Sequence, residues 1–281
     1  MGLTAWAARG LRLTSLIDRA YRKFDHARSA LVLSFASDRF LDEYNEVAYG
    51  KTDSYKPGSS EFRRGLFDWE EDAVNRYFPP APARVLVGGA GGGREAFALI
   101  DKGYSVVAFD PAEPLVRAMA AAATDERLRA YRGSYASLPM LTRVASPEGL
   151  RDTDSNEQID LRAEPSFDAA IAGWTSFSHL RNDRERVETL QKLAAVTSGP
   201  ILLSYLPDPA SSDTPPSGGA LSRWIRTRMR RRGPSVFSIQ IGYYRLLRHP
   251  DVEEIVRRAG LSVVGAERDG NWPYVVVKRA G

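Results

Sequence analysis

A glycine-rich stretch, VLVGGAGGGREAF at residues 85–97, separates a run of branched apolar residues from a segment with helical character. Glycine is unfavourable inside regular structure, so its accumulation here predicts a tight turn that something approaches closely. A strand that runs into glycines and then into a helix places main-chain amides and a helix N-terminus around a bound ligand. The stretch therefore predicts an α/β fold with a ligand at the end of its first strand.

The rest of the chain alternates apolar runs of strand length with helical segments. The predicted strands are residues 84–88, 105–110, 129–134, 167–174 and 200–206, and the predicted helices are 94–103, 114–123, 184–196 and 249–260. This alternation predicts a mostly parallel sheet covered by helices on both faces. Two further strands, 261–267 and 274–279, are separated by a segment too short for a helical crossover, so we expect them to form an antiparallel pair.

Residues 1–58 are predicted to form a helical cap or lid on a main domain of residues 59–281. Apolar residues at helical spacing predict an amphipathic helix that packs on the main domain, namely Leu13, Leu16, Ile17, Ala20, Phe24, Ala27 and Leu31. A helix lying on a membrane surface is the alternative. Residues 49–60 are predicted to be a loop, and residues 61–78 a helix that ends before Pro79.

Two polar segments are predicted to interrupt the main domain. Residues 146–166 have the composition of a surface insertion, and residues 207–245 form a second insertion. The second one begins with a loop rich in Pro, Gly and Ser and continues into residues 221–232, which contain six arginines. We expect this insertion to cover a substrate, and its arginines favour an anionic one. A solvated arginine-rich helix is the alternative.

Composition excludes several kinds of site. The chain has no cysteine, so disulfides, thiolate zinc sites and a cysteine nucleophile are excluded, in agreement with a cytoplasmic location. The histidines at 26, 179 and 249 are too scattered to predict a metal site. No segment has the length of apolar sequence that a membrane span needs, and the first thirty residues lack the apolar core of a secretory signal. A net charge of +4 is too modest to indicate nucleic-acid binding.

An acidic residue at the end of the second predicted strand limits the chemical classes of ligand that the glycine-rich turn is expected to bind. Asp110 lies 21 residues after Gly89, close to the ~20 expected of an acid that binds ribose hydroxyls. Gly89, Gly91 and Gly93 follow a GxGxG spacing, and Arg94 stands where a dinucleotide-binding fingerprint needs a small residue. An NAD-dependent oxidoreductase is therefore disfavoured, and an adenosine-containing cofactor of another kind is predicted.

This combination over residues 60–281 resembles the class I S-adenosylmethionine-dependent methyltransferases, of the type that acts on small molecules. The resemblance implies a Rossmann-like, seven-stranded, mostly parallel sheet with its last strand inserted antiparallel, helices on both faces and an N-terminal helical extension. It implies S-adenosylmethionine bound over the carboxyl ends of the first two strands. It also implies methyl transfer to O or N of a small molecule in a biosynthetic pathway.

The resemblance also implies roles for individual residues. In the cofactor site these are Gly89, Ala90, Gly91 and Gly93 of the turn, Asp110 on the ribose, Pro111, Ser134 and Tyr135 around the adenine, Trp174, and Arg64 on the cofactor carboxylate. Two positions depart from the family pattern, because Ser134 and Val87 stand where acids are usual. These departures leave open a homologue that binds cofactor without catalysis.

The acceptor site is expected between the fourth predicted strand, the N-terminal helices and the second insertion. The residues assigned to it are Tyr44, Tyr49, Trp174, Arg223 and Trp224, with His179 as the candidate general base. Ala172-Gly173-Trp174 replaces the Asn/Asp-Pro-Pro motif of enzymes that methylate the adenine amino group. A small-molecule acceptor is thus expected, with an RNA or protein acceptor held by residues 221–232 as the alternative.

Overall fold

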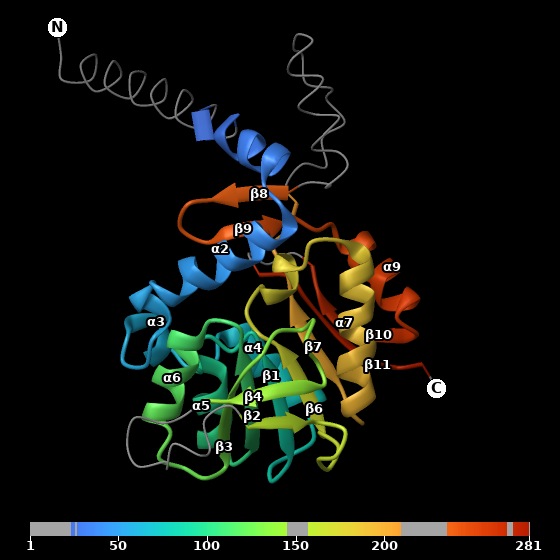
Figure 1. Cartoon of the computed structure of the whole chain (residues 1–281). Coiled ribbons are helices and arrows are strands. Elements are labelled where there is room, and N and C mark those ends of the chain that lie inside the picture. Colours follow the sequence, from blue (N-terminus) through green and yellow to red (C-terminus); the bar gives the residue numbers. More distant parts are fainter. Residues whose placement is uncertain (1–23, 26, 145–156, 209–234, 269–271, 281) are drawn as a thin grey trace, which may run out of the picture.

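A large sheet forms the centre of the molecule (Figure 1). The computed structural model describes residues 24–25, 27–144, 157–208, 235–268 and 272–280. The strands of the sheet are β1 (Arg84–Gly88), β2 (Ser105–Asp110), β3 (Leu128–Arg132), β4 (Met140–Arg143), β5 (Gln158–Asp160), β6 (Ala169–Ala172), β7 (Ile201–Ser204), β10 (Leu261–Glu267) and β11 (Tyr274–Arg279). Their order is β10-β11-β7-β6-β1-β2-β3-β4-β5.

The predicted topology is confirmed for the central part of this sheet. Strands β3, β2, β1, β6 and β7 are parallel neighbours, and β11 pairs antiparallel with both β7 and β10. The predicted number of seven strands is wrong, because β4 and β5 extend the edge beyond β3 by antiparallel pairing. Residues 158–160 thus form part of the sheet and not a surface insertion. With three residues, β5 is too short to show a strand period in its sequence.

Helices cover both faces of the sheet, as predicted. They are α4 (Asp68–Tyr77), α5 (Arg94–Asp101), α6 (Glu113–Ala122), α7 (Asp183–Val196) and α9 (His249–Arg258). Alternate residues of each strand point to opposite faces. Val85 and Val87 of β1 pack in the core under α4, α5 and α6, whereas Leu86 packs in the core under α7 and α9.

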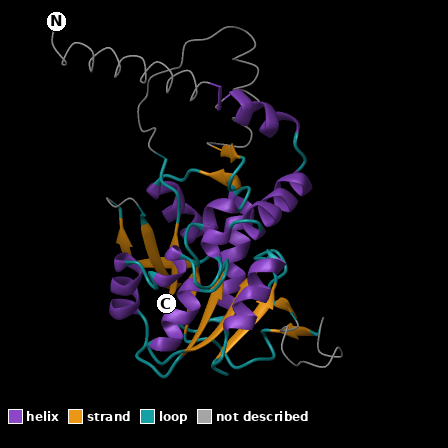
Figure 2. Cartoon of the chain, turned by 90° about the vertical axis from the view of Figure 1, so that its left-hand side faces the viewer, coloured by secondary structure: helices purple, strands orange, loops and turns teal. Residues whose placement is uncertain are grey.

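A smaller helical layer lies above the carboxyl ends of the parallel strands (Figures 1 and 2). It contains α2 (Asp38–Gly50), the 3-10 helix η1 (Asp53–Tyr55) and α3 (Ser60–Arg63). A hairpin of β8 (Ser235–Ser238) and β9 (Gly242–Arg245) packs against α2. The predicted loop at 49–60 is therefore wrong in part, because the last two residues of α2, the whole of η1 and the first residue of α3 lie inside it.

The single helix predicted at 61–78 is also wrong. Gly65 takes a left-handed conformation, with φ of +65°, which ends α3. The Glu70 carboxylate then accepts a hydrogen bond from the main-chain N–H of Phe67 at 2.8 Å and caps the start of α4. The chain turns between the two helices, and this turn brings α3 and η1 toward the glycine-rich turn of β1.

The N-terminal amphipathic helix is described only from residue 24 onward, and its packing differs from the prediction. Phe24 and Leu31 were expected against the main domain but are 69% and 58% exposed. Ala30 and Leu33 are buried instead, and Leu33 forms a small apolar cluster with the hairpin's Phe237. Because a hairpin about 200 residues away selects the buried face, the sequence spacing alone could not identify it. Among the described residues, no helix has the length and apolar character needed to cross a membrane.

Candidate functional site

Asp110 fixes the conformation of the glycine-rich turn. One carboxylate oxygen accepts the N–H of Gly91 at 2.9 Å, and the other accepts the N–H of Ala112 at 2.8 Å. The side chain is buried, and burial raises its pKa to about 6 against the lowering effect of these two hydrogen bonds. Each oxygen retains a lone pair, so this carboxylate is able to accept hydrogen bonds from a ligand as well.

The glycines of the turn serve different purposes. A Cβ on Gly91 would have no atom closer than 3.9 Å, and this residue has a φ of +55°. A Cβ on Gly89 would instead meet Ser176 at 2.6 Å, and one on Gly93 would meet Met119 at 2.7 Å. On Gly92 it would lie 2.0 Å from the main-chain oxygen of Tyr55 in η1. The turn thus leaves open space at Gly91, whereas the protein itself approaches the other three glycines.

A cavity of about 390 Å³ lies beside this turn and beneath α2. Its walls come from the β1–α5 turn, the end of β2, the segment after β6 and α2. Its lining includes Asp42, Asn45, Tyr49, Gly91, Arg94, Glu95, Asp110, Trp174, His179, Arg181, Glu185 and Trp272. The indole N–H of Trp174 is buried and has no hydrogen-bond partner among the described residues. The ring of Trp174 packs edge-on against those of Phe67 and Trp272.

Most of the residues predicted for the site line this cavity. They are Gly89, Ala90, Gly91, Asp110, Pro111, Ser134, Tyr135, Trp174, Tyr49 and His179. Gly93, Tyr44 and Arg64 are not among its lining residues. Tyr44 donates its hydroxyl proton to the main-chain oxygen of Ile239 in the hairpin, and the exposed Arg64 pairs with Glu61 at 3.3 Å. Arg223 and Trp224, with the other residues of 221–232, lie outside the described residues, so the expectation of an anionic acceptor stays a prediction.

His179 lies at the centre of a network that holds α2 over the cavity. Its Nδ1 is 2.7 Å from the main-chain oxygen of Tyr243, and its Nε2 is 2.8 Å from the Tyr49 hydroxyl. Burial lowers the pKa of His179 and raises that of Tyr49. The imidazole is therefore neutral, with Nδ1–H donating to the carbonyl and Nε2 accepting from Tyr49. Asn45 also binds the main chain of Tyr243, accepting at 2.7 Å and donating at 3.0 Å.

A buried ionic group, which the sequence did not reveal, lies at the side of the cavity near α5. Arg94 donates to both oxygens of Glu70, at 2.6 and 2.7 Å, and to Glu95 at 2.8 Å. Burial raises the pKa of Glu70 to about 7 despite the hydrogen bonds from Arg94. The available signal was Arg94 itself, which breaks the dinucleotide fingerprint, but its partner Glu70 is 24 residues away in another helix.

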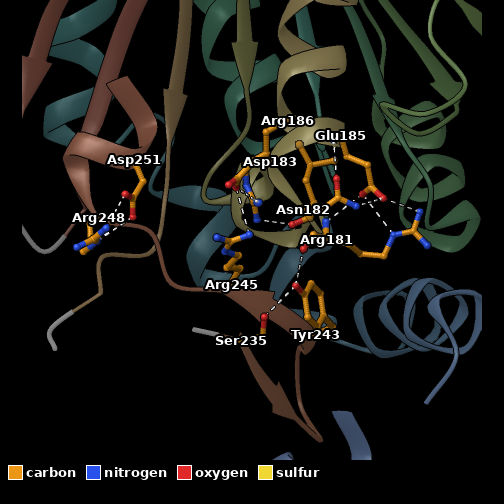
Figure 3. Close-up of polar contacts among 11 residues, drawn as sticks. Arg181, Asn182, Asp183, Glu185, Arg186, Ser235, Tyr243, Arg245, Arg248 and Asp251 are labelled. Carbon is orange, nitrogen blue, oxygen red and sulfur yellow. Dashed lines mark hydrogen bonds and ion pairs between the residues drawn. The ribbon is translucent and has the colours of Figure 1, made fainter. Parts of the chain in front are cut away.

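Charged side chains gather at the start of α7 (Figure 3). Arg181 pairs with Glu185 at 3.0 Å. It also pairs with Asp42 of α2 at 3.1 Å, so it links α2 to the start of α7. Asp183 is shared by Arg186 and Arg245, each at 3.2 Å. Among the described residues, no group of three or more His, Asp or Glu side chains is arranged to hold a metal ion.

Comparison with known proteins gives matches by structure. No family model and no curated protein matches the chain by sequence. The CcbJ methyltransferase from Streptomyces caelestis aligns with 84% of this chain and 99% of its own, at 18% identity and a TM-score of 0.55. The glycopeptide N-methyltransferase MtfA, solved with S-adenosyl-L-methionine, aligns with 87% of this chain and 98% of its own, at 15% identity and a TM-score of 0.51. With the strand order and the antiparallel β11, these matches show that the chain has the fold of the class I S-adenosylmethionine-dependent methyltransferases.

Proposed function

We propose that this protein transfers a methyl group from S-adenosylmethionine to an oxygen or nitrogen atom of a small molecule. The observation that carries the proposal is the cavity beside Gly91, which places open main chain next to the buried Asp110 carboxylate. Its volume of about 390 Å³ lies within the range of small-molecule sites. The similar structures are methyltransferases, and one of them is a glycopeptide N-methyltransferase.

The described residues fit the cofactor. The open main chain at Gly91 would hold the amino-acid part, and the remaining lone pairs of Asp110 would accept the two ribose hydroxyls. The unpartnered indole N–H of Trp174 is a donor left for a ligand or a water molecule. When bound, the sulfonium supplies a methyl group that is already activated for displacement. The protein's main task is then to align the acceptor with it, which contributes ~7–11 kcal/mol to lowering a barrier when geometry is near attack.

Tyr49 and His179 are the groups suited to remove a proton from the acceptor. Tyr49 and His179 both line the cavity, and the Tyr49 hydroxyl donates to His179 Nε2, which leaves lone pairs on its oxygen to accept from an acceptor O–H or N–H. A proton leaving the acceptor passes to the Tyr49 oxygen while the phenolic proton moves to Nε2. The carbonyl of Tyr243 keeps His179 in the tautomer that this transfer requires.

If Tyr49 has this role, its substitution should reduce turnover without weakening the binding of S-adenosylmethionine. Once a library of small nucleophiles has yielded an acceptor, detected as a mass increase of one methylene, we expect Tyr49→Phe to lower kcat by ~100-fold. Its dissociation constant for S-adenosylmethionine should stay within about twofold, because the phenol is assigned to the acceptor. Near-normal turnover in Tyr49→Phe and in His179→Ala would show that the pair only anchors the cap.

Binding provides the first test of the proposed function. Calorimetry and thermal shift with S-adenosylmethionine and S-adenosylhomocysteine should show binding of one molecule per chain. NAD should stabilise the protein less than either, since Arg94 occupies the position of the small fingerprint residue. Absence of heat and of a thermal shift with both nucleosides would contradict the proposal, and a larger stabilisation by NAD would favour an oxidoreductase.

Cofactor affinity is expected to fall in acid. Ribose hydroxyls donate to the ionised form of Asp110, whose pKa burial raises to about 6, so binding displaces a proton below that pH. Affinity therefore rises as the pH rises through about 6 and then levels off. Between pH 7 and pH 5 a single such group weakens binding by about tenfold. Titration calorimetry in two buffers of different ionisation enthalpy measures the released proton, and constant affinity across this interval would contradict the assignment.

A further inference from the structure

The buried ionic group formed by Glu70, Arg94 and Glu95, here called the triad, has more negative than positive charge. The exposed fractions of the three residues are 0%, 8% and 3%, so solvent screens them little. Arg94 has four hydrogen atoms on its two Nη nitrogens, and all four are used, two on Glu70, one on Glu95 and one on the main-chain oxygen of Gly65. Its fork is therefore not available to bind the carboxylate of a ligand.

The residues around the triad do not neutralise its excess negative charge. The remaining contacts of the two carboxylates are main-chain N–H groups, from Phe67 to Glu70 at 2.8 Å and from Trp174 to Glu95 at 3.1 Å. No second cation bonds to either carboxylate in the part of the chain that the structure describes. The aromatic ring of Phe67 lies over the Arg94 guanidinium, with the ring centroid 4.0 Å from the guanidinium carbon, so one face of the guanidinium is covered by an apolar group. Above the pKa of Glu70, which burial raises to about 7, the ionised triad carries one net negative charge.

The triad reaches the proposed cofactor site through Glu95 and Arg94, which both line the cavity within two residues of the glycine-rich turn. S-adenosylmethionine carries one more positive charge than S-adenosylhomocysteine, because methyl transfer converts the sulfonium into a neutral thioether. We propose that the triad makes this site select its cofactor by charge, holding the sulfonium form more tightly than the thioether product. This inference rests on the proposed function. It adds that the triad favours the replacement of bound S-adenosylhomocysteine by S-adenosylmethionine after each methyl transfer.

The test compares the two nucleosides in four forms of the full chain. Dissociation constants for S-adenosylmethionine and S-adenosylhomocysteine are measured by calorimetry for the wild type, Glu70→Gln, Glu95→Gln and the control Glu71→Gln. The Gln side chains keep an acceptor oxygen for Phe67 and Trp174 and remove the charge. Glu71 neighbours Glu70 but is half exposed and pairs with Lys102 at 2.6 Å, so its removal leaves the triad intact.

We expect the wild type to bind S-adenosylmethionine more tightly than S-adenosylhomocysteine. Each triad variant should reduce this preference on the order of tenfold, because one unit charge acting over several ångströms in a protein interior has an effect of this size. Glu71→Gln should keep the wild-type ratio. Glu70 does not line the cavity, so an effect of Glu70→Gln reports charge and not contact. A preference unchanged in both triad variants, or changed only in Glu95→Gln, would overturn the inference.

A measurement on the wild type keeps the test valid if a variant fails to fold. Sinefungin carries an amine at the position of the methyl-bearing sulfonium, so it is cationic there, whereas S-adenosylhomocysteine is neutral. The wild type should bind sinefungin more tightly than S-adenosylhomocysteine, and equal affinities would contradict selection by charge. If the wild type binds none of the three nucleosides, the proposed function fails. If it binds all three with equal affinity, only the inference about the triad fails.

Discussion

Asp110→Asn is expected to weaken the binding of S-adenosylmethionine and S-adenosylhomocysteine by at least ~100-fold. The carboxylate accepts Gly91 N–H and Ala112 N–H and is assigned both ribose hydroxyls, whereas an amide has a single acceptor oxygen. Hydrogen bonds to a charged group contribute ~1.5–3 kcal/mol each, and the loss of two corresponds to at least this factor. Calorimetry at pH 7.5 measures the effect.

Asp101→Asn provides the matched control for this change. Asp101 is an exposed carboxylate at the end of α5, and its replacement should leave both affinities unchanged. The melting temperature of Asp110→Asn without ligand separates a loss of binding from a loss of fold, because Asp110 also holds the turn. Wild-type affinity in a folded Asp110→Asn variant would remove the ribose assignment.

Arg94→Met is expected to destabilise the protein by about 3–5 kcal/mol at pH 7.5. The substitution leaves the buried Glu70 and Glu95 without their cation, and breaking a buried ion pair by removing one partner has a cost of this size. The cost should be smaller at pH 5. Burial raises the pKa of Glu70 from its ordinary 4.5 to about 7 although Arg94 lowers it, so the loss of Arg94 raises this pKa further. Protonation of Glu70 stabilises the folded state fully below about 4.5, and this contribution is lost as the pH rises through the folded pKa. It is larger in the variant than in the wild type, which reduces the cost of the substitution at pH 5.

Urea unfolding at pH 7.5 and pH 5 measures both parts of this prediction. Arg76→Met is the control, since Arg76 pairs with Asp72 on the exposed face of α4 at 3.0 Å and such surface pairs contribute ~1 kcal/mol or less. Adding Glu70→Gln to Arg94→Met should recover part of the lost stability. Equal losses in Arg94→Met and Arg76→Met would show that the triad is not a buried charge group in solution.

The central fold could be predicted because its signals are local in sequence. Clustered glycines identify the β1–α5 turn, and Asp110 follows 21 residues after Gly89. The strands of the parallel sheet are short, continuous apolar runs. Two of the errors in the fold come from elements with weak local signals. The edge strand β5 has three residues, and the break at Gly65 depends on a cap that Glu70 forms with Phe67.

The features of the site that could not be predicted from the sequence are contacts between residues far apart in the chain. Tyr49 and His179 could each be named as candidates, but their hydrogen bond joins residues 130 positions apart. Asn45 looks like an ordinary polar helix residue until Tyr243, 198 positions later, is placed beside it. The family resemblance implied an arginine for the site at Arg64, whereas the buried arginine that lines the cavity is Arg94, which the chain between α3 and α4 approaches through the main-chain oxygen of Gly65.

A crystal structure of this protein with S-adenosylhomocysteine tests the central claim most directly. We predict the two ribose hydroxyls within hydrogen-bonding distance of the Asp110 carboxylate, and the amino-acid part of the ligand against the main chain of Gly91. A nucleoside bound elsewhere on the surface, or a cavity beside Gly91 filled by the protein's own side chains, would contradict the account.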